Sequence, residues 1–148
     1  MHSVIPDRLY RQILRVMPIA CVDLLVFDQV GQILLVRRNN EPVKGQWWFP
    51  GGRVWFGEMR EAAARRKLKE ECGIDAKLVK EFGTYDVILP VKGSFVHAVS
   101  TVYRLSVAQD SRVILDQQSS EFRWRSVEDW LKDPIDDFVR GILKQEIH

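Results

Sequence analysis

A glycine turn that leads into a charged helical segment, residues 52–74, constrains this chain of 148 residues more than any other feature. Residues four apart in an α-helix share a face, so Arg66 is expected beside Glu70, and Lys67 beside Glu71. Adjacent helical residues are about 100° apart, which lets both glutamates border one side of the helix. The segment therefore predicts a helix with a carboxylate edge next to a glycine turn.

The same helix has a separate apolar stripe, formed by Ala64, Leu68 and Cys72, which predicts that it packs onto a sheet. A carboxylate edge beside a glycine turn suits Mg²⁺, a hard ion that often bridges one or two carboxylates to substrate phosphates. The alternative is a solvated surface helix held by salt bridges, which is what charge runs usually indicate. The spacing of the segment favours the metal site.

That spacing resembles the signature of the Nudix hydrolases, G-x5-E-x7-R-E-U-x-E-E-x-G-U, where U is a bulky apolar residue. The matching positions are Gly52, Glu58, Arg66, Leu68, Glu70, Glu71, Gly73 and Ile74. The resemblance implies an α+β fold, an α/β/α sandwich with a mixed β-sheet, in a single domain over residues 1–148. One position differs, because Lys67 stands where the signature has a carboxylate. We expect its ammonium group to replace an acidic ligand and repel a second cation, so that one Mg²⁺ is held strongly.

The composition is typical of one globular domain, with 46% apolar and 28% charged residues. A net charge of +2 gives no electrostatic basis for binding nucleic acid or a membrane surface. The chain shows neither a signal peptide nor an apolar run of about 18 residues, so we expect a cytoplasmic protein. Cys21 and Cys72 lie in apolar runs and are predicted to be buried thiols rather than a disulfide or metal pair.

Hydrophobic periodicity divides the chain into helices and strands. Helices are predicted at residues 6–16, 58–71, from 126 onward and 134–146, and strands at 18–27, 33–36, 46–50, 76–89, 94–107 and 121–125. Gly73 is expected to end the central helix, and Ser126 opens a small helix with a capping-box pattern.

Residues 18–124 are similar to the GDP-mannose mannosyl hydrolase branch of the Nudix family, which also departs from the signature near Lys67. The resemblance implies that Asp23, Arg38 and Arg53 serve a bound nucleotide sugar. Arginine suits a diphosphate because its guanidinium group donates two parallel hydrogen bonds, although surface solvation is the alternative for both arginines. An unpaired carboxylate is costly to bury, so Asp23 in an apolar strand favours a sugar hydroxyl or a cation as its partner.

The candidate Mg²⁺ ligands are Glu70, Glu71, the backbone carbonyl of Gly51 or of the glycine after it, and Gln118. The two glutamates follow from their place on the helix. The glycine carbonyl and Gln118 are implied by the resemblance. Glu58 is either a further ligand or a helix N-terminal acid favoured by the helix dipole.

The general base is left open by the sequence. The resemblance implies a histidine after Gln118, but Ser119 stands there, and serine is not a competent base near neutral pH. Glu121 is the nearest carboxylate and would activate water if its pKa and reach allow. His97 matches another histidine of the branch and is either a site residue or structural. Arg66 is expected to orient the first glutamate of the pair rather than to touch the substrate.

Aromatic residues surround the glycine turn. Trp47 is the candidate for stacking on a nucleobase or sugar, whereas core packing is expected of Trp48. Residues 1–16 are a candidate dimer-forming segment, because Leu9 and Ile13 lie on one side of the first helix. The related branch also uses its N-terminal segment in a dimer.

The favoured function is Mg²⁺-dependent hydrolysis of a nucleoside diphosphate sugar, GDP-mannose first, by attack of water at the anomeric carbon. The alternative enzyme attacks phosphorus and is a pyrophosphohydrolase of a nucleoside triphosphate or related nucleotide. A third hypothesis is a non-catalytic nucleotide-sugar sensor that kept the cleft and lost its base.

Overall fold

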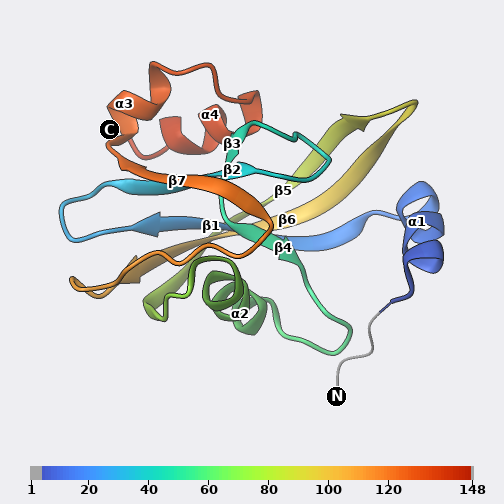
Figure 1. The fold of residues 1–148 in the computed structure, drawn as a ribbon, viewed down its shortest axis with the longest axis horizontal. Coiled ribbons are helices and arrows are strands. Elements are labelled where there is room, and N and C mark those ends of the chain that lie inside the picture. The colour runs from blue at the N-terminus through green and yellow to red at the C-terminus, as the bar shows by residue number, and fades with distance from the viewer. Residues whose placement is uncertain (1–4, 148) are drawn as a thin grey trace.

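The computed structural model describes residues 5–147, which form a curved seven-stranded sheet with helices on both faces (Figure 1). The strands are β1 (Ile19–Phe27), β2 (Ile33–Arg38), β3 (Trp47–Trp48), β4 (Gly51–Arg53), β5 (Ala76–Val91), β6 (Ser94–Val107) and β7 (Ser119–Arg125). The helices are α1 (Asp7–Val16), α2 (Arg60–Cys72), α3 (Val127–Leu131) and α4 (Asp137–Lys144).

The sheet is mixed, as expected. Its main order is β3-β2-β1-β6-β5, with β4 paired to β1 and β7 paired to β2. Strands β1 and β6 run parallel, whereas the other pairs are antiparallel. The α+β sandwich predicted from the sequence is therefore confirmed.

Two cores lie on the two faces of the sheet. Strand β1 feeds both, because alternate side chains of a strand point to opposite faces: Val22 and Leu24 pack toward α2, whereas Leu25 packs toward α3 and α4. The core on the side of α3 and α4 contains Trp130, which is fully buried. Its indole Nε1 donates to the Ile33 carbonyl at 3.0 Å.

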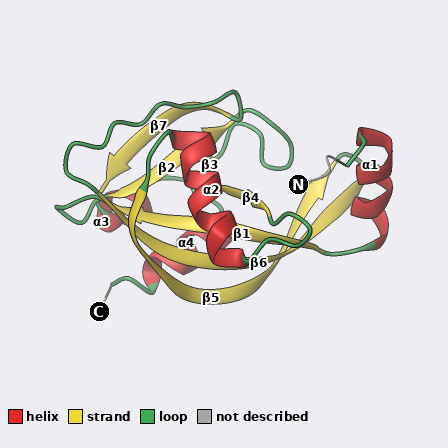
Figure 2. Cartoon of the chain, turned by 90° about the horizontal axis from the view of Figure 1, so that it is seen from below, coloured by secondary structure: helices red, strands yellow, loops and turns green. Residues whose placement is uncertain are grey.

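Helix α2 packs through the predicted stripe, since Ala64, Leu68 and Cys72 are all buried. It ends at Gly73, whose φ of 70° is the left-handed conformation that favours glycine. The helix starts at Arg60, two residues later than predicted, because Glu58 stays in the loop and its Oε1 accepts from the Trp55 amide at 3.0 Å. Figure 2 shows α2 lying across one face of the sheet.

Other element ends differ from the prediction for local reasons. The last helix starts at residue 137 because the Asp136 side chain caps it by accepting from the Phe138 amide at 2.8 Å. Ser126 likewise caps α3, as predicted, by accepting from the Asp129 amide at 3.1 Å. The predicted strand at 46–50 is reduced to two residues, β3, paired with the end of β2.

Helix α1 stands at one end of the sheet, against β6, and none of its residues is buried (Figures 1 and 2). Residues 1–4 of the proposed dimer-forming segment lie outside the described residues. Both cysteines are free thiols, as expected. Cys72, the last residue of α2, is buried, and Cys21 on β1 is partly buried.

Candidate active site

A cavity of about 430 Å³ opens where the glycine turn, α2, the β5–β6 hairpin and α1 meet. It brings together residues that the sequence singled out from six separate regions: Asp23, Arg38, Gly51, Arg53, Glu71, His97 and Gln118. This volume is within the roughly 300–1,000 Å³ of small-molecule sites. The other candidates, Trp47, Arg66, Glu70 and Glu121, do not line it.

The glycine turn is fixed by close approach to β1. Gly51 pairs with Asp23 and Gly52 with Val22. A Cβ atom on Gly51 would come within 2.2 Å of the Val22 carbonyl oxygen, so only glycine fits this position. The turn then meets α2, because the Gly51 amide donates to Glu71 Oε2 at 2.7 Å.

Glu71 is the buried member of the glutamate pair, with 5% of its surface exposed. Burial raises the pKa of Glu71 to about 7, while Lys67 and the hydrogen bond from the Gly51 amide act in the opposite direction. Burial therefore disfavours the charged form of this carboxylate, and a bound cation would favour it.

Arg66 connects the signature residues that lie beside the cavity. It donates to Glu70 Oε1 and Oε2 at 3.1 Å each, which confirms the predicted pair. It also binds both carboxylate oxygens of Glu58, at 2.7 and 2.9 Å, and the Arg53 carbonyl at 2.9 Å. Its guanidinium group stacks 3.5 Å above the Trp55 ring. Glu58 therefore accepts hydrogen bonds both from the loop, at the Trp55 amide, and from Arg66. Through Arg66, the signature residues Glu58 and Glu70 belong to one hydrogen-bond network.

The donor set fits Mg²⁺. Among residues 5–147, no three His, Cys, Asp or Glu side chains converge as a complete metal cage. Mg²⁺ does not require one, because it commonly takes one or two carboxylates and completes its shell with water and substrate phosphates. Glu70 and Glu71 lie side by side, Lys67 Nζ being 3.5 Å from the first and 3.9 Å from the second. Gln118 also lines the cavity, where its Oε1 accepts from Asn40 at 2.8 Å.

Asp23 lines the same cavity, where it pairs with Gly51 across β1 and β4, and 8% of its surface is exposed. Its Oδ2 accepts from the Ser100 hydroxyl at 2.5 Å. Burial raises the pKa of Asp23 to about 6, although the hydrogen bonds from Ser100 and Trp48 oppose the shift. The walls around it are mostly apolar, formed in part by Phe49 and Val87.

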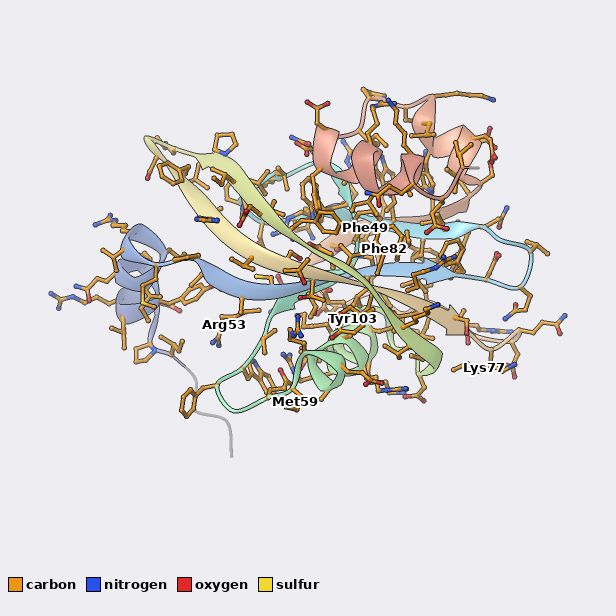
Figure 3. All side chains as sticks on the ribbon, turned by 180° about the vertical axis from the view of Figure 1, so that it is seen from behind. Phe49, Arg53, Met59, Lys77, Phe82 and Tyr103 are labelled. Atoms are coloured by element: carbon orange, nitrogen blue, oxygen red, sulfur yellow. The ribbon has the colours of Figure 1, made fainter. Side chains whose placement is uncertain are left out.

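The basic residues reach the cavity from different strands. Arg38 follows a bulge in the β2–β7 pairing, and its Nε donates to the Pro42 carbonyl at 2.9 Å. Figure 3 shows Arg53 between α1 and the loop before α2, and its guanidinium carbon lies 5.5 Å from the Tyr10 ring centre. His97, on β6, has its Nε2 3.4 Å from Asp86 Oδ1.

Glu121 and Trp47 are placed elsewhere, which corrects two of the site assignments. Glu121 pairs with Arg37 at 3.0 Å and with Arg123 at 3.6 Å, because its partner on β2 is Arg37 rather than Arg38. Trp47 packs 5.3 Å from the Trp130 ring instead of facing the cavity. Its neighbour Trp48 lines the cavity and also packs in the core, where its ring lies 5.7 Å from that of Phe138.

Three contributions to the cavity were not predicted. Tyr10 and Leu14 bring α1 into its wall, and residues 41–43 close another side. The apolar spacing of α1 was visible in the sequence, but nothing local indicated which part of the molecule this helix contacts.

The chain resembles known proteins in both sequence and structure. Residues 17–145 match the NUDIX domain family. The chain is 31% identical over 123 residues to the low-salt glycan biosynthesis protein Agl8 of Haloferax volcanii, covering 80% of this chain and 78% of that protein. It is 37% identical over 90 residues to the ADP-ribose pyrophosphatase of Methanocaldococcus jannaschii, covering 61% of this chain and 52% of that protein. The crystal structure of a MutT NUDIX hydrolase from Burkholderia pseudomallei superposes with a TM-score of 0.74 at 28% identity, over 87% of this chain and 98% of that one.

Proposed function

This chain belongs to the NUDIX family, and on that premise we propose that it is a hydrolase of nucleoside diphosphate sugars, with GDP-mannose as the first candidate substrate. The observation that carries the proposal is the make-up of one cavity. It brings Arg38, Arg53 and Lys67 together with Glu71 and with the buried carboxylate of Asp23. Cationic groups suit a diphosphate, and a buried carboxylate suits the hydroxyl groups of a sugar.

Glu70, Glu71, the Gly51 turn and Gln118 are the residues that we propose to hold Mg²⁺. The ion would polarise an oxygen of the diphosphate and stabilise the charge that develops on it. Lys67 occupies the position of an acidic ligand, so we propose one strongly bound ion. Arg66 is proposed as a positioning residue, since it fixes Glu70, Glu58 and the turn carbonyl together.

Arg38 and Arg53 are proposed to bind the diphosphate and to stabilise the nucleoside diphosphate as it leaves. His97 is the better candidate for the general base, because it lines the cavity and Glu121 does not. The Asp86 carboxylate, 3.4 Å from His97 Nε2, is placed to orient the imidazole ring. Water activated there would attack the anomeric carbon of the sugar.

The relatives support two versions of this chemistry. The name of Agl8 refers to glycan biosynthesis, which favours a sugar nucleotide. The name of the ADP-ribose pyrophosphatase favours the second candidate, attack at phosphorus with cleavage of the pyrophosphate. Both versions use the same cations and the same acids, so the position of bond cleavage decides between them.

Hydrolysis of GDP-mannose in ¹⁸O water with Mg²⁺, followed by mass spectrometry of the products, tests the proposal. We expect label in mannose and none in GDP. Label in phosphate would replace the proposal with pyrophosphohydrolysis. A panel of nucleotide sugars and triphosphates that bind tightly without any Mg²⁺-dependent turnover would instead identify a sensor.

A homodimer is also proposed, with α1 at its interface. This helix has no buried residue, and Leu9 and Val16 expose about half and about three quarters of their surfaces, 48% and 77%. Light scattering of the purified protein measures the assembly directly. Within residues 5–147, no helix is long and apolar enough to cross a membrane. The cytoplasmic location expected from the sequence stays a prediction.

A further inference from the structure

Lys67 extends into the active-site cavity along a path that Gly52 leaves open. Its side chain is only 13% exposed. A Cβ atom on Gly52 would lie 2.6 Å from Lys67 Cε and 3.1 Å from its Nζ, so a larger residue there would displace the lysine. The ammonium group is thus inside the cavity that also holds Glu71 and Arg53.

This ammonium group is held loosely. It lies 3.5 Å from Glu70 Oε2 and 3.9 Å from Glu71 Oε1, both longer than an ordinary charged hydrogen bond of about 2.7–2.9 Å. Each glutamate already has a closer partner: Arg66 donates to Glu70 at 3.1 Å, and the Gly51 amide donates to Glu71 at 2.7 Å. Lys67 therefore contributes charge to the glutamate pair, whereas other groups fix its geometry.

We propose that Lys67 is a tethered cation that changes partners during the reaction cycle: it is the counter-ion of Glu70 and Glu71 before a divalent ion binds, and a ligand of the substrate diphosphate afterwards. The inference rests on the proposed function, because it needs a diphosphate in this cavity. A divalent ion held by Glu70 and Glu71 would cancel the attraction that holds the ammonium group and would repel it. The substrate diphosphate, which we propose to bind to Arg53, would then be the nearest anion.

Lysine suits this exchange. Its charge is compact and sits on a flexible stem of four carbons, whereas arginine has a planar group that prefers a fixed two-point contact. Arg66, one residue earlier, shows the contrast, since five hydrogen bonds hold its guanidinium group in place. Two adjacent basic residues of α2 thus have separate tasks: Arg66 fixes the acids, and Lys67 moves between anions.

The exchange predicts opposite effects of one substitution on two ligands. Removing the charge with Lys67→Met removes a competitor of the metal, so Mn²⁺, titrated without nucleotide and followed by electron paramagnetic resonance, is expected to bind about tenfold more tightly. Nucleoside diphosphate, titrated as GDP and as ADP by calorimetry under saturating Mg²⁺, is expected to bind about tenfold more weakly. A residue with only a structural role would shift both constants in the same direction.

Lys69→Met is the matched control, because it removes the same charge from the same helix. Its side chain is 59% exposed and pairs with Asp75 outside the cavity. We expect less than about a twofold change in either constant. Lys67→Arg keeps the charge and is expected to recover part of the diphosphate affinity.

The results separate the inference from the function on which it rests. Mn²⁺ affinity that is unchanged or weaker in Lys67→Met overturns the exchange, as does unchanged diphosphate affinity. If the wild-type protein binds neither GDP nor ADP, the proposed function fails. The Mn²⁺ titration still decides in that case whether Lys67 opposes the metal. Thermal unfolding of each variant checks that the fold is retained.

Discussion

Two parts of the cavity wall are built in different ways. In the part formed by the glycine turn and α2, charged groups and a backbone amide bind one another, and the amide of Gly51 and its acceptor Glu71 are only 20 residues apart in the chain. In the part around Asp23, the partner Ser100 is 77 residues away, on the neighbouring parallel strand. The first part depends on charge and short-range spacing, and the second on burial and strand pairing. We infer that the first sets the chemistry and the second the choice of substrate.

The largest expected effect comes from removing a charge from the part of the wall that α2 forms. Glu71→Gln is expected to lower kcat/KM by roughly 10²–10³-fold, because an amide does not supply the negative charge that a metal ligand needs. The fold is expected to hold, since glutamine still accepts the hydrogen bond from the Gly51 amide. Steady-state kinetics with a range of Mg²⁺ concentrations measures the effect.

Glu61→Gln is the control for that experiment. Glu61 lies on the same helix, but its side chain is 58% exposed and pairs with Arg65. Activity within about twofold of wild type is expected. Equal losses in both variants would mean that the charge of α2 matters and the position of Glu71 does not.

The glycine turn joins the two parts of the wall, because Gly51 pairs with Asp23 and donates to Glu71. Its two glycines should respond differently to a methyl group. Gly51→Ala places its Cβ 2.2 Å from the Val22 carbonyl, so it is expected to destabilise the fold by about 3 kcal/mol. Gly52→Ala meets the far end of the flexible Lys67 side chain and is expected to cost less than about 1 kcal/mol. Urea unfolding of the two variants gives both values. Similar losses would show that β4 tolerates the two substitutions equally.

The smallest expected effect concerns the contribution of Asp23 to the free energy of unfolding. The folded-state pKa of Asp23 is about 6, above the ordinary 3.8, so the carboxyl group contributes most to stability below pH 4 and this contribution is lost as the pH rises through 6. Asp23→Asn does not titrate. Relative to wild type, the variant is expected to gain on the order of 1–3 kcal/mol between pH 4 and pH 8, while losing turnover of the nucleotide sugar.

Urea unfolding of both proteins at pH 4, 5, 6, 7 and 8 measures this difference. Subtracting the two curves removes the contributions of other groups that titrate in the same range, such as Glu71. A constant difference across the series would contradict a buried, charged Asp23.

The difference between short-range and long-range contacts also determines what could be predicted from the sequence. The helix α2, its apolar stripe, its end at Gly73 and the Arg66–Glu70 pair all follow from spacing within one helix, and all are present. Asp23 was singled out for a different reason, because a carboxylate in an apolar strand needs a partner, although nothing local identified that partner as Ser100.

The positions of Glu121 and Trp47 could not be predicted in the same way. Which face a strand residue occupies depends on the partner strand, and a bulge between Arg37 and Arg38 shifts the pairing next to the cavity. Glu121 is close in sequence to Ser119, but its side chain does not line the cavity. The contribution of Tyr10 depends on where α1 docks, which is also a property of the whole fold.

The two thiols give the molecule a further property. Burial raises the pKa values of Cys21 and Cys72 to about 12, and the thiolate form is the nucleophile that attacks an alkylating reagent. We therefore expect the folded protein to react slowly with such reagents at neutral pH, so that the rate of labelling reports how often the structure opens. Cys21 lies in the cavity wall, whereas Cys72 belongs to the core between α2 and the sheet. Peptide mapping of the label would therefore measure the rate of opening of each region separately.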